Sequence, residues 1–323
     1  MREDNKKSKA NIDDFKNFKT SIGGQALIEG IMMRGPSKIS IVVRTNDGIV
    51  ETSEVLKPLK EKYPILGFPF IRGVVNLGSS MKQGVRSIMY SAEQMPEEEQ
   101  ENPSKFDAWL EKKLSSEKAE KVIITFAVIF GMAFSIALFM LLPTFLAGFV
   151  ARYVESPIIK NLIEGGIRIL IFLTYLWLTS KMSYIKRVWA YHGAEHMAIY
   201  CYEKGLPLTL ENVKKQSTLH PRCGTSFLFI VMIVSIFVFS FISWDNLFVR
   251  FILRIALLPI VVSISYEIIR LAGRYNNIFT RIVSAPGRAL QKLTTSTPDD
   301  DMLEVAIHAL QAVIPEDKKE ATW

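Results

Sequence analysis

The distribution of apolar residues along the chain predicts four membrane-spanning helices. A helix needs about 20 mostly apolar residues to cross the hydrocarbon core of a bilayer, which is roughly 30 Å thick. Four segments come close to or exceed that length: 122–150, 162–179, 226–244 and 247–269. Residues 227–241 include no charged side chain, which argues against buried helices of a soluble protein. The pattern therefore predicts a predominantly α-helical, polytopic transmembrane domain over residues 122–270.

Basic residues in the connections between these segments predict the orientation. Lysine and arginine are enriched in loops on the cytoplasmic side of a membrane. They are frequent in loop 181–225 and after the fourth segment, whereas the connection between the first two segments carries only Arg152 and Lys160. We therefore expect a multi-pass protein of the plasma membrane, in contact with the lipid bilayer. Both termini and loop 181–225 are expected in the cytoplasm.

Polar and apolar positions also predict a small α+β region before the first span. Two alternating runs, 39–44 and 49–55, flank Asn46-Asp47-Gly48, a strong signal for a β-hairpin turn. Apolar residues at helical spacing over 71–91 predict an amphipathic helix or a pair of helices. Their apolar stripe could pack on the hairpin or lie in the membrane interface. The predicted parts outside the transmembrane domain are a disordered terminus at 1–20, a cytoplasmic α+β region at 21–92, a charged linker at 93–121 and cytoplasmic helices at 271–323.

Composition narrows the class of protein further. The formal net charge of +7 suits a protein beside an anionic membrane surface. The basic residues form no stripe interleaved with aromatic side chains, so we expect no nucleic-acid partner. Two cysteines cannot build a disulfide framework, and the first residues lack the apolar core of a signal peptide. Protein partners and the oligomeric state are not predicted.

Histidines concentrate between the second and third spans in a pattern typical of metal ligands. His192 and His196 are four residues apart, so on a helix they project from one face and can bind one metal ion. Glu195 completes H-x-x-E-H, the order found in inverted zinc-peptidase motifs. We predict a site for a divalent transition metal, with zinc as the expected ion. Its predicted ligands are His192, His196, His220 and Cys223.

Two roles of such a metal stay open. In a closed site with four protein ligands, the metal would hold the loop on the membrane bundle and do no chemistry. With three ligands and an open position, Glu195 could act as the general base of a hydrolase. Without a metal, the two helical histidines would be polar residues of a juxtamembrane helix. Five further residues are candidates for supporting the site or binding a substrate: Glu267, Arg222, Gln25, Glu29 and Arg34.

A second motif, GGQALIEGIMMRGP at residues 23–36, contributes three of these candidates. Its glycines allow tight turns and a close approach of the backbone to a partner. No Gly-Lys-Ser/Thr follows, so the motif is not a phosphate-binding loop. The side chains of Gln25, Glu29 and Arg34 could face a ligand. Alternatively, the stretch is an irregular segment packed by its Leu, Ile and Met residues.

The two motifs together resemble a known family. GGQALIEGIMMRGP, YHGAEH, HPRCGTSF, SYEIIRLAGR and TPDDDMLEVAIHAL are similar, in this order, to the bacterial DUF1385 family, and the resemblance covers residues 21–313. It implies a metal-dependent membrane protein with a His/Glu/Cys site, and it names no substrate. The leading hypothesis is a zinc-dependent hydrolase at the cytoplasmic face. The rival is a non-catalytic membrane scaffold or assembly factor with a structural metal site. A transporter is less favoured because the spans show no internal repeat.

Overall fold

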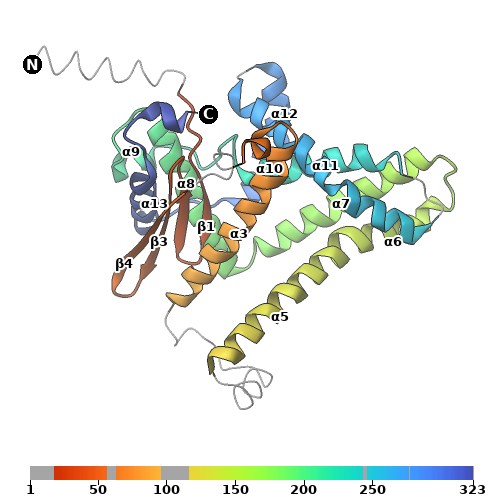
Figure 1. Cartoon of the computed structure of the whole chain (residues 1–323), viewed down its shortest axis with the longest axis horizontal. Helices are drawn as coiled ribbons and strands as arrows, with labels where there is room; N and C mark the ends of the chain where they lie inside the picture. Colours follow the sequence, from red (N-terminus) through yellow and green to blue (C-terminus); the bar gives the residue numbers. More distant parts are fainter. Residues whose placement is uncertain (1–17, 57–62, 96–115, 243–245, 276, 323) are drawn as a thin grey trace, which may run out of the picture. The chain divides into compact units, whose positions relative to one another are not determined.

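The computed structural model describes residues 18–56, 63–95, 116–242, 246–275 and 277–322, most of which are helical (Figure 1). Most of the terminus at 1–20 expected to be disordered, and of the linker expected at 93–121, lies outside the described residues. The chain divides into two compact units. The first comprises Met1–Gln94, Leu176–Ser235 and Leu253–Trp323, and the second comprises Met95–Tyr175 and Ile236–Ile252.

The first unit contains a four-stranded antiparallel sheet with the strand order β1-β2-β3-β4. The strands are β1 (Gly23–Leu27), β2 (Gly30–Arg34), β3 (Lys38–Thr45) and β4 (Gly48–Val55). The hairpin predicted around Asn46-Asp47-Gly48 is confirmed, because Thr45 pairs with Gly48 across the turn between β3 and β4. Gly48 has a φ of 130°, a backbone conformation that residues with a side chain rarely adopt.

The glycine-rich motif forms the other hairpin of this sheet. Leu27 pairs with Gly30, so Ile28 and Glu29 make the turn, with Glu29 in the left-handed region at a φ of 48°. The interpretation of this stretch as an irregular segment is therefore wrong. Strand β1, GGQAL, lacks the β-branched residues and the alternation that signal a strand. Its pairing with β2, whose Ile31 and Met33 are fully buried, holds it in place.

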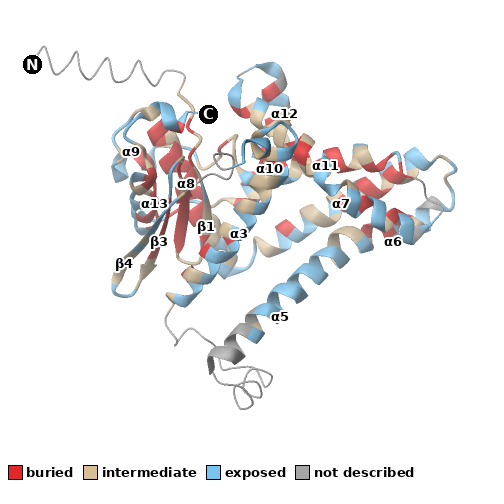
Figure 2. Cartoon of the chain, viewed as in Figure 1, coloured by how far each residue is buried: buried red, intermediate tan, exposed pale blue. Residues whose placement is uncertain are grey.

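Helices α8 (Ser183–Glu203) and α13 (Asp300–Val313) pack against the sheet and against each other, and together they enclose the core of the first unit (Figures 1 and 2). The fully buried side chains at this junction include Ile31, Tyr191, Leu303 and Leu310. Full burial of one such aliphatic side chain stabilises a fold by about 1.5–3 kcal/mol. The core therefore fixes α8, the helix that carries the two spaced histidines.

Small residues let α8 sit deep in the unit. From Ala190 to Glu203 nearly every residue of the helix is buried. At Gly193 an added Cβ would collide with the carbonyl oxygen of Ser296, so the segment after α12 runs directly over the helix. Shorter elements complete the unit: η1 (Pro64–Gly67), α9 (Leu210–Lys214), α12 (Ile278–Thr294) and η4 (Lys318–Ala321).

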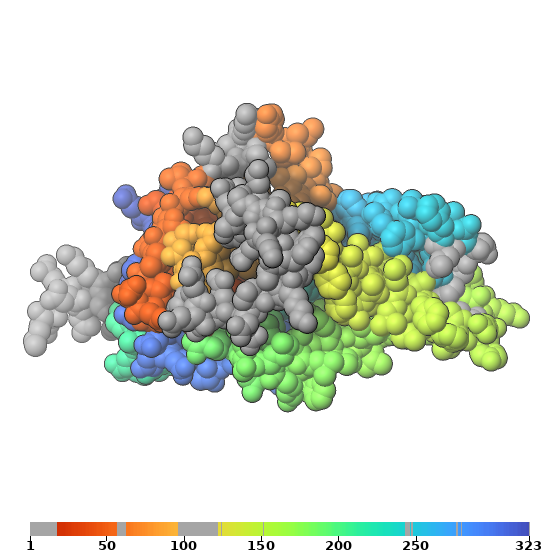
Figure 3. Space-filling model, turned by 90° about the horizontal axis from the view of Figure 1, so that it is seen from below, coloured from red at the N-terminus to blue at the C-terminus, as the bar shows by residue number. Residues whose placement is uncertain are grey.

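Helix α3 (Ile71–Glu93) packs through its small residues and leaves its apolar stripe exposed. Gly73 lies against Tyr266, and Gly84 lies against Gln25 of β1. The exposed stripe consists of Ile71, Val74, Met81, Val85, Ile88 and Met89. The atoms of α3, drawn in orange, lie at the surface of the molecule in Figure 3. The amphipathic helix is confirmed, but the alternative in which its stripe packs on the hairpin is wrong.

Within the described residues, three helices are long and apolar enough to cross a membrane: Thr125–Val150, Pro157–Thr179 and Phe248–Arg274. They correspond to the first, second and fourth predicted spans. The first is made of α5 (Ser116–Ile136), a π-helical turn η3 (Ala137–Leu141) and α6 (Leu142–Ala151), whereas α7 (Pro157–Thr179) and α11 (Leu247–Arg274) are continuous. The third predicted span, 226–244, overlaps with α10 (Gly224–Phe239), a helix of 16 residues. At 1.5 Å per residue such a helix is about 24 Å long, short of the hydrocarbon core.

Three charged residues in the apolar helices of the second unit are paired with one another. Glu164 and Arg168 lie one turn apart on α7, with 3.1 Å between their charged atoms. Arg250 of α11 lies 3.6 Å from the same carboxylate. All three residues are buried. An ionisable residue in an apolar environment is tolerated when it has such a partner, so these charges are compatible with membrane helices.

Candidate metal centre

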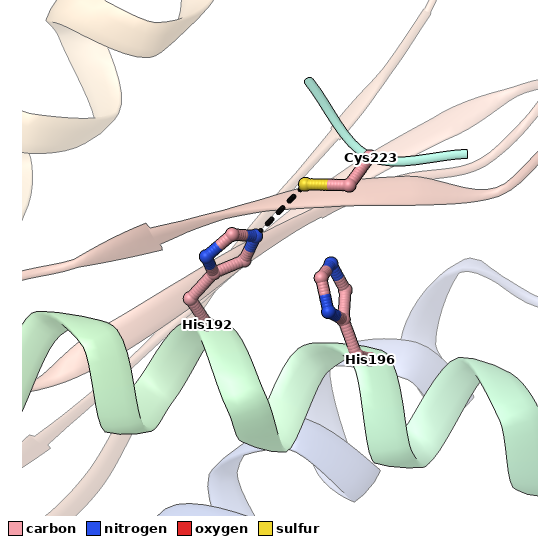
Figure 4. A group of neighbouring side chains, drawn as sticks. All are labelled: His192, His196 and Cys223. Atoms are coloured by element: carbon pink, nitrogen blue, oxygen red, sulfur yellow. Dashed lines mark hydrogen bonds between the residues drawn. The ribbon is translucent and has the colours of Figure 1, made fainter. Parts of the chain in front are cut away.

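Two histidines and a cysteine converge in the first unit (Figure 4). His192 and His196 project from one face of α8, as their spacing predicts, and Cys223 faces them from the segment just before α10. One ligand atom from each residue lies within 4.8 Å of the other two. Nε2 of His192 is 3.0 Å from Sγ of Cys223. The three side chains could therefore hold one metal ion.

Backbone carbonyls orient both imidazoles. Nδ1 of His192 lies 2.7 Å from the carbonyl oxygen of Thr294, and Nδ1 of His196 lies 2.5 Å from that of Thr218. Because a carbonyl oxygen only accepts hydrogen bonds, each Nδ1 carries the proton and each Nε2 keeps a lone pair. This is the arrangement usual for histidines that bind metals through Nε2. Nε2 of His196 is buried and has no hydrogen-bond partner in the part of the chain that the structure describes.

The local electrostatics favour the protonation states that a metal needs. Burial lowers the pKa of His196, which keeps its imidazole neutral. Burial alone would raise the pKa of the Cys223 thiol, but the neighbouring His196 and Thr225 lower it below its ordinary value. Thr225 also donates a hydrogen bond from its hydroxyl to Sγ of Cys223, at 3.3 Å. Neutral imidazole and thiolate are the forms that bind metal ions.

Glu195 connects the helix of the histidines to the amino-terminal sheet. The backbone N–H of Gly24 in β1 donates to Oε1 of Glu195 at 3.0 Å. A Cβ on Gly24 would lie 2.9 Å from Cδ of Glu195 and 2.7 Å from the carbonyl oxygen of Met32, so only glycine fits between them. Burial raises the pKa of Glu195 to about 7. The two sequence motifs therefore meet at this carboxylate.

His220 lies outside the group that the structure brings together. Its Nε2 is 3.3 Å from Oε2 of Glu203, and Glu203 also pairs with Arg222. Its backbone is fixed by Gln291, whose side chain accepts from the N–H of His220 at 2.7 Å and donates to its carbonyl oxygen at 2.6 Å. Of the four predicted ligands, the structure therefore groups His192, His196 and Cys223.

The other candidate residues fall into two groups. Glu29 and Glu267 are bound elsewhere, because Glu29 pairs with Arg187 and Glu267 pairs with Arg72. Gln25, Arg34 and Arg222 instead line a cavity of about 730 Å³ within the first unit. The same cavity is lined by Glu195, His196 and Cys223. The structure therefore places three of the five beside the histidine–cysteine group.

The sequence did not reveal several residues that build the site. Gly24 could have been suspected from the double glycine of its motif. Gln291 and Glu203 gave no signal, because each is a single polar residue in a helix whose partner is distant in sequence. The carbonyls that orient the imidazoles belong to Thr218 and Thr294, and backbone groups leave no mark in a sequence.

The fold and this group of side chains define a largely helical protein with membrane-type apolar helices, a small antiparallel sheet and a buried His/Cys cluster. The chain belongs to the DUF1385 family, described as proteins of unknown function, whose profile matches residues 68–316. It is 34% identical over 296 residues to the uncharacterized protein YqhQ of Bacillus subtilis (strain 168), covering 90% of this chain and 92% of that protein. No solved structure gives a significant match.

Proposed function

We propose that the chain is a membrane metalloprotein that holds zinc through Nε2 of His192, Nε2 of His196 and Sγ of Cys223. The orientation of the imidazoles carries this proposal, since both rings donate from Nδ1 to a backbone carbonyl. Both Nε2 atoms therefore keep a lone pair with which to bind a metal ion shared with Cys223. Two imidazoles and one thiolate form a donor set that suits zinc.

We further propose that the site is catalytic and hydrolytic. Three protein donors leave a fourth position open, as in zinc enzymes, and the adjoining cavity offers room for a substrate. When bound, zinc would supply Lewis acidity toward water and a substrate oxygen. Glu195 lines this cavity as the general base, and burial raises the pKa of its carboxyl group above the ordinary value. Gly24 binds one oxygen of this carboxylate and holds it in place.

A second candidate is a membrane scaffold or assembly factor with a structural metal. The observation that favours it is burial, because His192, His196 and Glu195 are all buried. In this case the site would be closed to a substrate, and the metal would only hold α8 on the segment before α10. A closed site of this kind performs no chemistry.

Metal analysis followed by one substitution separates these functions. Elemental analysis of the purified full chain should find about one zinc per chain, lost in His192→Ala/His196→Ala and kept in His308→Ala. His308 is the matched control, since it pairs with Glu51 on the surface. The absence of metal in the parent protein, before and after addition of zinc, would refute both candidates.

Glu195→Gln should keep the metal and abolish hydrolysis in a screen of ester, amide and phosphoester substrates. A Glu195→Gln protein as active as the parent would refute the catalytic proposal.

For the membrane, we propose four crossings of the plasma membrane with both termini and the metal centre on the cytoplasmic side. Three described helices have the required length, and α10 is assigned as the fourth crossing. The absence of charged side chains in α10 supports this assignment, as do the basic residues in the loop before it. A short helix is accommodated by local thinning of the bilayer at a modest free-energy cost.

A further inference from the structure

The cavity beside the metal centre is enclosed by parts of the chain that are far apart in sequence. Glu195, His196 and Cys223 line it on one side. Strands β1 and β2 contribute Gln25 and Arg34, α3 contributes Asn76 and Gln83, and α11 contributes Tyr266. With about 730 Å³, the cavity is within the size range of small-molecule sites. One ligand could therefore contact both Arg34 of β2 and the metal centre.

Arg34 differs in its partners from Arg72 and Arg222, two other arginines that line the cavity. Arg72 pairs with Glu267, and Arg222 pairs with Glu203. The guanidinium of Arg34 donates instead to two neutral groups, Oε1 of Gln83 at 3.0 Å and Oγ of Ser80 at 3.5 Å. Among the described residues no carboxylate forms an ion pair with it. Arg34 is half-buried, and this burial lowers the pKa of its guanidinium.

A partly desolvated guanidinium without a counterion is unfavourable unless an anion completes the site. We propose that this cavity binds an oxyanion of the substrate, a phosphate or carboxylate group, with Arg34 as its counterion. This assignment rests on the proposed function, because it makes the cavity the substrate pocket of the same centre. A guanidinium binds such groups through two parallel hydrogen bonds, and the bond to Gln83 fixes its orientation. Since α11 is a membrane-type helix, the oxyanion could belong to a lipid head group or to a soluble molecule.

The test uses inorganic phosphate as the probe and a protein without the metal ligands. The variant His192→Ala/His196→Ala lacks both histidine ligands, so phosphate cannot bind through a metal held by them. A change in unfolding temperature then reports binding to the rest of the cavity. Millimolar phosphate should raise the unfolding temperature of this protein above that in chloride of equal ionic strength. Adding Arg34→Gln should weaken the apparent phosphate affinity at least tenfold, whereas Arg34→Lys should retain part of it. Arg86→Gln is the control, because Arg86 is an exposed arginine paired with Glu54.

Nanodiscs distinguish the two sources of the oxyanion. If a lipid head group is bound, phosphatidylglycerol should raise the unfolding temperature relative to phosphatidylcholine, and Arg34→Gln should remove the difference. If the ligand is soluble, only phosphate should give an effect that depends on Arg34. The proposal is overturned if neither probe gives an effect that depends on Arg34. The metal content of the parent protein gives a separate answer. If the parent binds no zinc but the response depends on Arg34, the proposed function is refuted and the oxyanion site stands.

Discussion

Gly24 is the residue at which the amino-terminal hairpin meets the helix of the histidines. Its N–H binds Glu195, and its missing side chain leaves room for that carboxylate between β1 and α8. The adjacent Gly23 is different, since a Cβ there would meet no atom within 4 Å. Neither residue has a positive φ. Space, and not backbone conformation, therefore distinguishes the two glycines.

We expect Gly24→Ala to destabilise the first unit and to displace Glu195. Overpacking of a filled site costs about 1–3 kcal/mol, and one contact here is a backbone oxygen that cannot rotate away. Gly23→Ala should change stability by less than about 0.5 kcal/mol. Thermal unfolding of the two purified variants compares them directly. Equal unfolding temperatures would show that Glu195 is not held in the way described.

Glu203 is a second residue whose removal should have a large effect. It is buried, pairs with Arg222 and His220, and accepts a hydrogen bond from the N–H of Thr20. Removing one partner of a buried ion pair costs about 3–5 kcal/mol, so Glu203→Gln should unfold at a much lower temperature. Glu211→Gln, which removes an exposed pair with Lys215, should change the unfolding temperature little.

The difference between the parent protein and Glu203→Gln should also depend on pH. Burial alone would raise the pKa of Glu203, but His220 and Arg222 hold it below its ordinary value of about 4.3. The stabilisation is therefore complete above that value and is lost as the pH falls through the lower folded-state pKa. Unfolding temperatures measured from pH 7 downward should converge below about pH 4. A difference that stays constant over this range would contradict the ionised pair.

At the residue scale, spacing predicted the convergence of His192 and His196 but not that of every ligand candidate. Their separation of four residues fixes both on one face of any helix. The position of His220 depends instead on Glu203 and Gln291, which no local pattern connects to it. Local patterns thus predict groups within one element, and they do not predict contacts between elements.

At the scale of elements, the apolar pattern of α3 predicts a helix, and the structure confirms it. The pattern does not determine which way the apolar stripe of this helix faces. A period of 3.6 residues shows that a stripe exists. It does not show whether the stripe faces a protein core or a lipid phase. Gly73 and Gly84 determine the outcome, because they let α11 and β1 approach the opposite side of the helix. The stripe stays exposed at the surface of the helix.

We expect the exposed stripe of α3 to contact the bilayer interface. The helix packs on α11, a membrane-type helix, through Asn76 and Tyr266, and an amphipathic helix in this situation buries its apolar face among lipid head groups. Phospholipids with a photoreactive acyl chain should label Met81 and Val85 in nanodiscs, with adducts located by mass spectrometry. Val55, an equally apolar and exposed residue of β4, is the control. Labelling of α3 no stronger than that of Val55 would exclude the contact.

At the scale of the whole molecule, the composition of the first unit restricts the number of membrane crossings. The chain leaves this unit after Gln94 and enters it again at Leu176. It leaves the unit a second time after Ser235 and enters it again at Leu253. Hydrogen bonds join the last segment to the middle one, as between Thr294 and His192. The sheet, α8 and α13 share one core, so we expect all three of them on one side of the membrane. Each excursion between them must cross an even number of times, so that if α11 crosses, α10 crosses as well despite its length.

An even number of crossings in each excursion predicts a topology that fusion proteins can test in bacterial cells. A fluorescent protein fused after Trp323 should fold and fluoresce, and alkaline phosphatase at the same position should stay inactive, because both enter the cytoplasm. Phosphatase fused after Asn246, between α10 and α11, should be active outside the membrane. If the sheet and α8 are cytoplasmic, an active phosphatase after Trp323 would require an odd number of crossings and would separate α13 from α8, in conflict with the core that they share. Inactive phosphatase at both positions would mean that neither α10 nor α11 crosses, leaving two crossings instead of four.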